Sequence, residues 1–86
     1  MSFFVYILRT SSDTFYIGQT NNLEKRIEEH KSKSSKSAKY IRYFSSFDLV
    51  YHEKHATRNK AMKREAELKR LTRVKKEALI REKDIT

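Results

Sequence analysis

Five side chains able to take part in hydrolytic chemistry are spread over four short segments of this 86-residue sequence. Tyr6 and Tyr16 are phenols, Arg26 and His30 supply a guanidinium and an imidazole, and Glu65 supplies a carboxylate. A histidine can exchange a proton near neutral pH, and arginine and glutamate carry full charges there. Whether these groups act together depends on whether the elements that carry them meet in the fold.

The first predicted helix carries two of these residues on its inward face. Leu23, Arg26, Ile27 and His30 recur at i, i+3, i+4 and i+7, the spacing of a stripe that faces a core. The helix is predicted to run to about Lys31. A chain this short has few inward positions to spare, so a guanidinium and an imidazole on this stripe need a reason.

The second long helix, predicted to start at Thr57 as its N-cap and to end near Leu71, repeats this pattern. One line along it should face the sheet, and it holds Ala61, Glu65, Leu68 and Thr72, with Met62 alongside. An unpaired buried charge costs several kcal/mol. Two alternatives follow: an Arg26–Glu65 ion pair beside a hydrogen-bonded histidine, or a wet pocket lined by these polar groups.

The phenols belong to a predicted β-hairpin over residues 3–18. The run "SFFVYILR" suits a central strand covered on both faces, "SSDT" supplies a turn and "FYIG" a second strand. If Arg9 pairs with Phe15, Tyr6 and Tyr16 share one face, one diagonal step apart. Gly18 permits an unusual backbone angle or the close approach of another segment, or simply ends the strand.

The remaining signals complete the order ββαβαα. Asn21 is expected to cap the first helix, with Glu24 as its capping-box partner. The alternating "FDLVYHEKH" predicts a third strand, whose His52 and His55 are expected at the surface, and Thr72 is expected to cap a last helix from Val74 to about Arg81.

This order predicts a small α/β fold, an antiparallel three-stranded sheet flanked by helices. We expect a single domain over residues 1–86, with a core at about 3–81 and a mobile, Lys- and Ser-rich basic loop at about 31–39.

Charge is the strongest signal in the composition. Twenty Lys and Arg residues against eleven Asp and Glu give a net charge of +9, the footprint expected of a protein that binds nucleic acid. There is no cysteine and no apolar run near the roughly 20 residues that a membrane span needs. These features predict a cytoplasmic protein without a membrane partner.

Several separated motifs make the sequence resemble the GIY-YIG nuclease family, in particular its small single-domain bacterial members. The paired signature is present as Val5-Tyr6-Ile7 and Tyr16-Ile17-Gly18. "LEKRIEEH" follows, similar to the family helix that carries an arginine and, four residues later, a histidine, and "AMKREAELKRL" is similar to the segment with the metal-binding glutamate. The resemblance spans about residues 3–80 and extends to the catalytic domains of DNA-repair nucleases and homing endonucleases.

The resemblance implies an endonuclease that hydrolyses phosphodiester bonds, with DNA expected rather than RNA. It also implies a catalytic set, and the members of that set are Tyr6, Tyr16, Arg26, His30 and Glu65. Glu65 is the implied ligand of a single Mg²⁺ or Mn²⁺ ion, since Mg²⁺ keeps several waters and needs few protein ligands. We expect Tyr6 and His30 to form the base system and Tyr16 to position water or phosphate, although the two tyrosines could exchange these roles.

Basic and aromatic residues outside this set are expected to bind the nucleic acid, through phosphate contacts and base stacking. They are Lys31, Lys33, Lys36, Lys39, Tyr40, Arg42 and Lys69. The alternative for the loop is a solvated segment with Tyr40 packed on the core.

Two departures from the family pattern leave a second function open. Val5 stands where the name-giving glycine is expected, and no asparagine follows Glu65. The alternative function is a non-catalytic nucleic-acid-binding module that retains the nuclease fold. We expect a monomer whose activity is weak, directed by nucleic-acid structure, or dependent on a protein partner that supplies specificity.

Overall fold

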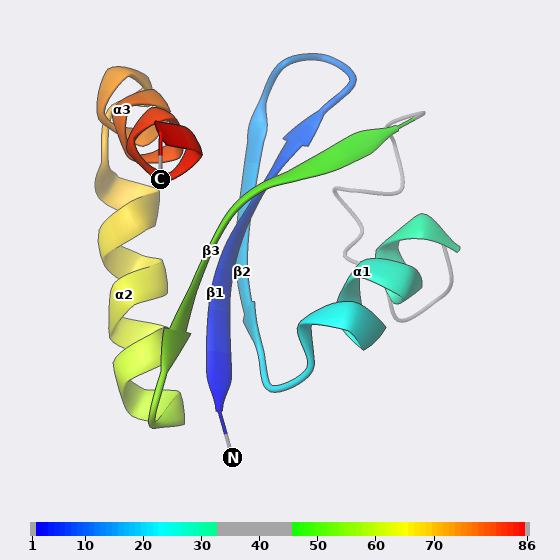
Figure 1. The fold of residues 1–86 in the computed structure, drawn as a ribbon, viewed down its shortest axis with the longest axis vertical. Helices are drawn as coiled ribbons and strands as arrows, with labels where there is room; N and C mark the ends of the chain where they lie inside the picture. The colour runs from blue at the N-terminus through cyan, green and yellow to red at the C-terminus, as the bar shows by residue number, and fades with distance from the viewer. Residues whose placement is uncertain (1, 33–45, 86) are drawn as a thin grey trace.

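The computed structural model describes residues 2–32 and 46–85, which form three strands and three helices (Figure 1). In chain order they are β1 (Phe3–Thr10), β2 (Phe15–Thr20), α1 (Leu23–Lys31), β3 (Phe47–His55), α2 (Arg58–Arg70) and α3 (Arg73–Ile85). The predicted order ββαβαα and the α/β fold class are confirmed.

The sheet has the order β2-β1-β3, with both neighbours antiparallel to the central strand β1. Arg9 pairs with Phe15 and Tyr6 with Gly18, which is the register predicted from the turn. Asp13, at φ 61°, takes the left-handed conformation that closes the hairpin. The two phenols are therefore projected from one face of the sheet.

β1 serves a different core on each of its faces. Val5 and Ile7 pack with Ile17 and with residues of α2 and α3, whereas Tyr6 and Leu8 face α1. Figure 1 shows α1 on one side of the sheet and α2 and α3 on the other. The prediction of a central strand covered on both faces is thus confirmed, and Val5, Tyr6, Ile7 and Leu8 are at most 1% exposed.

A β-bulge interrupts the pairing of β1 with β3. Ile7 pairs with Tyr51 but Leu8 pairs with Leu49, so β3 carries one extra residue, Val50, at this point. Beyond the bulge, Tyr51 lies opposite Ile7 and Glu53 opposite Val5, so both lie on the face that α2 and α3 cover.

The first helix starts one residue later than predicted. Asn22, not Asn21, is the N-cap, because its side chain accepts the Lys25 N–H at 3.1 Å. The Thr20 hydroxyl accepts the Asn22 N–H at 3.2 Å and fixes the chain there. Glu24 then falls at the second helical position, where the predicted capping box does not form.

The other helix caps agree with the sequence, but the ends differ by a few residues. Thr57 caps α2 by accepting the Lys60 N–H, and Thr72 accepts the Lys75 N–H ahead of α3. α2 stops at Arg70 because Leu71 is extended, and α3 runs on to Ile85, beyond the predicted end near Arg81. No helix formed by the described residues is long and apolar enough to cross a membrane.

Candidate active site

The centre of the site is a contact between β1 and α1. The Tyr6 hydroxyl lies 3.1 Å from Nε2 of His30, although 24 positions separate the two residues in the sequence. His30 reaches the sheet because it lies on the inward stripe of α1, one turn beyond Ile27. Both side chains are fully buried, at 1% and 0% exposed.

Gly18 creates the space in which the phenol lies. It is the β2 partner of Tyr6 in the sheet, and a Cβ atom at this position would lie 2.5 Å from the Tyr6 hydroxyl oxygen. The φ angle of Gly18 is not positive, so the glycine serves close approach and not an unusual backbone conformation.

Tyr16 completes an aromatic cluster over the same face. Its ring centroid lies 6.3 Å from that of Tyr6 and 5.6 Å from that of His30, the latter edge-on. Phe47 from β3 also packs edge-on against His30, at 6.0 Å. These geometries fall within the range of favourable aromatic pairs, so the imidazole is held in one orientation.

Arg26 brings positive charge to this cluster. Its guanidinium pairs with Glu29 at 3.4 Å and also acts on Tyr6 through a hydrogen bond and its charge. The Arg26 side chain is 25% exposed, so it is open in part to solvent.

The surroundings keep both members of the central pair neutral at physiological pH. Burial, with a smaller contribution from Tyr16, raises the pKa of Tyr6 to about 12, and Arg26 opposes this rise. Burial, together with the charge of Arg26, lowers the pKa of His30 to about 4. A neutral imidazole has a nitrogen lone pair, so His30 can accept the proton of the Tyr6 hydroxyl.

Glu65 is carried by α2, on the other side of the sheet from α1 (Figure 1), and its charge acts on Tyr6. Its negative charge helps to raise the pKa of Tyr6, but by less than burial and Tyr16 do. The Glu65 carboxylate pairs with Lys69 at 3.1 Å and its side chain is 22% exposed. In the part of the chain that the structure describes, no three His, Cys, Asp or Glu side chains converge on one point.

This donor set fits one kind of metal site. A divalent ion at Glu65 would have a single protein ligand and would take its other ligands from water and phosphate oxygens, as Mg²⁺ commonly does. A structural zinc site, which needs three or four nitrogen or sulfur ligands, does not fit.

Comparison with known proteins identifies the family. The GIY-YIG catalytic domain matches residues 2–83. The chain belongs to the GIY-YIG family. A UPF0213 protein of Natronomonas pharaonis is 40% identical over 77 residues, covering 90% of this chain and 88% of that protein. The UPF0213 protein YazA of Bacillus subtilis is 38% identical over 80 residues, covering 93% and 79%.

Two solved structures agree with the fold of this GIY-YIG domain. The solution NMR structure of a UPF0213 protein from Bacillus halodurans is 39% identical, with a TM-score of 0.59 over 93% of this chain and 83% of that one. A second NMR structure, of a protein from E. faecalis, is 31% identical, with a TM-score of 0.66 over 100% and 90%. The resemblance predicted from the motifs is confirmed, and it indicates nuclease-type chemistry and nucleic-acid binding in general terms.

The alternative of an Arg26–Glu65 ion pair does not describe the partners that these residues have. Arg26 pairs with Glu29, on its own helix, and Glu65 pairs with Lys69. Each charge is thus compensated locally within its own helix, at a spacing of three or four residues, where helical side chains are neighbours.

The stripe predicted on α2 is only partly correct. Ala61 and Leu68 are fully buried, but Met62 is 48% exposed and Thr72 is exposed. Thr72 leaves the stripe because α2 ends before it, at Arg70. Glu65 is intermediate in exposure, at the margin of the buried face.

Of the residues predicted to bind nucleic acid, the structure describes only two. Lys31 is the exposed last residue of α1, and Lys69 is exposed on α2. The others lie outside the described residues, and they are Lys33, Lys36, Lys39, Tyr40 and Arg42.

Sequence reasoning missed a second polar cluster, on the α2 side of the sheet. Glu53 accepts hydrogen bonds from Tyr51 and, at 3.0 Å for each carboxylate oxygen, from Nε of Arg64, and it pairs with His55 at 2.8 Å. His52 is exposed as predicted, and His55, also predicted at the surface, is 22% exposed and held by Glu53. The signal was present, because Glu53 alternates in phase with Tyr51 along the strand.

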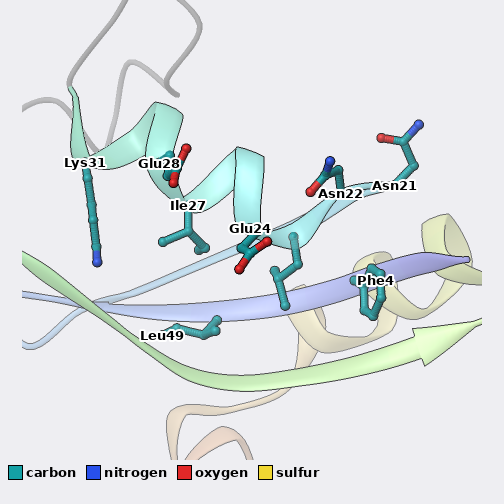
Figure 2. Close-up of a pocket in the computed structure, with 9 residues that line it drawn as sticks. Phe4, Asn21, Asn22, Glu24, Ile27, Glu28, Lys31 and Leu49 are labelled. Carbon is teal, nitrogen blue, oxygen red and sulfur yellow. The ribbon is translucent and has the colours of Figure 1, made fainter.

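A hollow of about 590 Å³ lies between α1 and the sheet, away from the predicted catalytic set (Figure 2). Phe4 and Leu49 from the sheet and Ile27 from α1 make its walls apolar, and Glu24 and Glu28 lie along its helical side. Lys31, predicted to bind nucleic acid, also lines this hollow. Two carboxylates against one ammonium group, beside an apolar surface, disfavour a phosphate ligand, and none of the predicted catalytic residues lines the hollow.

Proposed function

We propose that this GIY-YIG domain is a metal-dependent endonuclease that hydrolyses phosphodiester bonds of DNA. The observation that carries the proposal is the buried contact between Tyr6 and His30, with Arg26 and the charge of Glu65 acting on the same phenol. A hydroxyl whose proton has an acceptor, beside a guanidinium and a carboxylate, suits the activation of water next to a phosphate.

In this proposal Tyr6 and His30 act as one base. With a pKa of about 12, the Tyr6 hydroxyl would lose its proton to bulk water only at a cost of about 7 kcal/mol at pH 7. In a relay, Tyr6 takes the proton of the attacking water as its own proton passes to His30 Nε2, at 3.1 Å, so no free phenolate forms. Because the pKa of His30 is lowered to about 4, the relay also requires the bound phosphate, an anion, to stabilise the imidazolium. Tyr16, the more exposed phenol, positions that water or the phosphate.

In the same scheme Arg26 holds the phosphate and Glu65 holds the metal ion. The planar guanidinium of Arg26 can donate two hydrogen bonds to nonbridging oxygens, which a lysine cannot reproduce. Glu65 would hold a single Mg²⁺ or Mn²⁺ ion, which when bound supplies positive charge to the phosphoryl oxygens. Since Lys69 neutralises Glu65 in this structure, the ion must compete with an ammonium group.

A cleavage assay with a matched pair of variants tests the proposal. Nicked, branched, single-stranded and duplex DNA, with RNA alongside, are incubated with Mg²⁺ or Mn²⁺ and with wild type, Glu65→Gln or Glu67→Gln. Both substitutions remove one carboxylate charge from the same helix. Glu67, which is 62% exposed, is the control position. We expect Glu65→Gln to lower the rate about 100-fold or more, and Glu67→Gln to leave it within a few-fold. Equal rates for all three proteins would contradict the proposal.

One observation favours a second function, a nucleic-acid-binding module that does not cleave. Tyr6 is 1% exposed, so attacking water reaches its hydroxyl only if the side chains above it move. If wild type binds DNA and cleaves none of these substrates with either metal, this second function is the correct one.

A further inference from the structure

A second hollow lies at the outer edge of β2, on the side where α2 and α3 meet the sheet. Its volume is about 380 Å³, and its lining residues are Phe15, Tyr16, Ile17, Lys69 and Lys76. We call it the β2-edge hollow. It contrasts with the hollow of Figure 2, because it is lined by two lysines and no carboxylate.

The charge of the β2-edge hollow is only partly compensated. Lys69 pairs with Glu65, but no carboxylate of the described residues pairs with Lys76. Lys76 is half-buried, whereas its neighbour Lys75 is exposed. Partly removing an ammonium group from water without a counterion costs free energy, and an anionic ligand would recover that cost.

The strand edge adds hydrogen-bond donors to the two ammonium groups. Within the described sheet β2 pairs only with β1, so on its outer side alternate backbone N–H groups have no strand partner. Lysine ammonium groups and backbone N–H groups are the donors that proteins present to the phosphates of nucleic acids.

The aromatic residues of the hollow are less suited to stacking on a base. The guanidinium groups of Arg73 and Arg9 lie 4.8 and 5.3 Å from the centre of the Phe15 ring. Tyr16 packs against Tyr6 and His30. The ligand that fits the hollow is therefore a backbone phosphate and not a nucleobase.

We propose that the β2-edge hollow binds a second backbone phosphate of the nucleic acid, next to the one at the candidate active site. Two residues join the places: Tyr16 lines the hollow and belongs to the aromatic cluster, and Lys69 lines the hollow and contacts Glu65. The inference deepens the proposed function and rests on it for the nature of the ligand. Lys76 is the new residue that it assigns to binding.

The test compares Lys76→Met with Lys75→Met, which removes the same charge from the exposed neighbouring position. Binding of a fluorescein-labelled 16-base-pair duplex is measured by anisotropy in EDTA, across a series of NaCl concentrations. We expect Lys76→Met to make the slope of log affinity against log salt shallower by about 0.9, the value for one lost phosphate contact, and Lys75→Met to leave it nearly unchanged.

A second measurement follows the backbone of the strand. In ¹H–¹⁵N NMR spectra of the wild type, the same duplex should shift the amide signals of residues 15–17, and in Lys76→Met these shifts should be smaller. Equal slopes and equal shifts in the two variants would overturn the inference, and so would a failure of the wild type to bind the duplex.

The outcome is separable from that of the cleavage assay, because binding is measured without metal. Equal slopes alongside cleavage that depends on Glu65 would remove only the phosphate subsite. Unequal slopes without any cleavage would support the subsite and contradict the nuclease proposal.

Discussion

The hydroxyl of Tyr6 and Nε2 of His30 lie 3.1 Å apart, and this contact joins the central strand to the helix that covers it. Both groups are buried, and Arg26 also acts on the phenol. The pair therefore stabilises the fold as well as supplying the proposed base, and the two contributions can be measured separately.

Replacing Tyr6 with Phe removes one partner and leaves the other buried. We expect Tyr6→Phe to lower the free energy of unfolding by about 1–3 kcal/mol, because the His30 nitrogen loses its hydrogen bond without gaining water. Urea denaturation measures this loss. In the double variant Tyr6→Phe, His30→Phe the losses should not add. Additive losses would contradict an interaction between these two groups.

The stability of the protein should depend on pH through His30. The folded-state pKa of about 4 lies below the usual 6.5, so between these values the unfolded chain binds the extra proton. The contribution of neutral His30 to the free energy of unfolding is complete above pH 6.5 and falls by about 3 kcal/mol as the pH is lowered to 4.

His30→Gln is the control for this pH dependence, since glutamine does not titrate. Urea denaturation of both proteins from pH 7.5 to pH 4 gives the difference in stability at each pH. The free energy of unfolding of the wild type minus that of His30→Gln should decrease by about 3 kcal/mol between pH 6.5 and pH 4. A constant difference would show that His30 titrates in the folded protein as it does in the unfolded chain.

Gly18→Ala should perturb the phenol directly. The added methyl group would lie 2.5 Å from the Tyr6 oxygen and 2.7 Å from the ring carbon that bears it, so the ring must move away from its present position. Overpacking of this kind costs about 1–3 kcal/mol. Gln19→Ala, at the adjacent and partly exposed position, serves as the control.

Chemical shifts of the His30 ring report whether Gly18→Ala also disturbs the contact with Tyr6. We expect these shifts to change in Gly18→Ala and to stay at their wild-type values in Gln19→Ala. A Gly18→Ala protein of wild-type stability with unchanged His30 shifts would show that the glycine does not create space for the phenol.

The Glu53–Arg64 ion pair should contribute more to stability than the exposed pairs do. Arg64 Nε lies 3.0 Å from both carboxylate oxygens, and the side chains are 28% and 18% exposed. Double-mutant cycles should give a coupling of about 1–2 kcal/mol here and about 0.3–0.5 kcal/mol for Arg73–Glu77, whose side chains are 44% and 35% exposed. Equal couplings would mean that the burial of Glu53 has no energetic effect.

Local sequence signals were sufficient for the sheet and for the inward face of α1. The hairpin register follows from the turn that joins Arg9 and Phe15, and this register puts the two phenols on one face. The spacing of Leu23, Ile27 and His30 identifies the buried stripe because a helix repeats every 3.6 residues. Both patterns depend on residues that are close in the sequence, and for that reason the sequence alone predicts them.

What the sequence did not show depends on contacts between distant residues. The bulge at Val50 depends on how β3 meets β1, and the partners of Glu53 include Arg64 from another element. Asn21 and Asn22 are equally good caps by residue type, and in the structure it is Asn22 whose side chain accepts the Lys25 N–H and whose own N–H is held by Thr20. Nothing in the sequence distinguishes Lys76 from the other lysines, and only the structure places it beside β2.

The burial of β1 has a consequence for motion. Val5 and Tyr6 are adjacent in the chain, yet their side chains belong to the two opposite cores. Amide protons at the centre of β1 should therefore exchange with deuterium only in the rare molecules that unfold completely. If so, the strand that carries Tyr6 opens only when the whole domain is lost, and the phenol of the proposed base keeps its place on the sheet for as long as the native state persists.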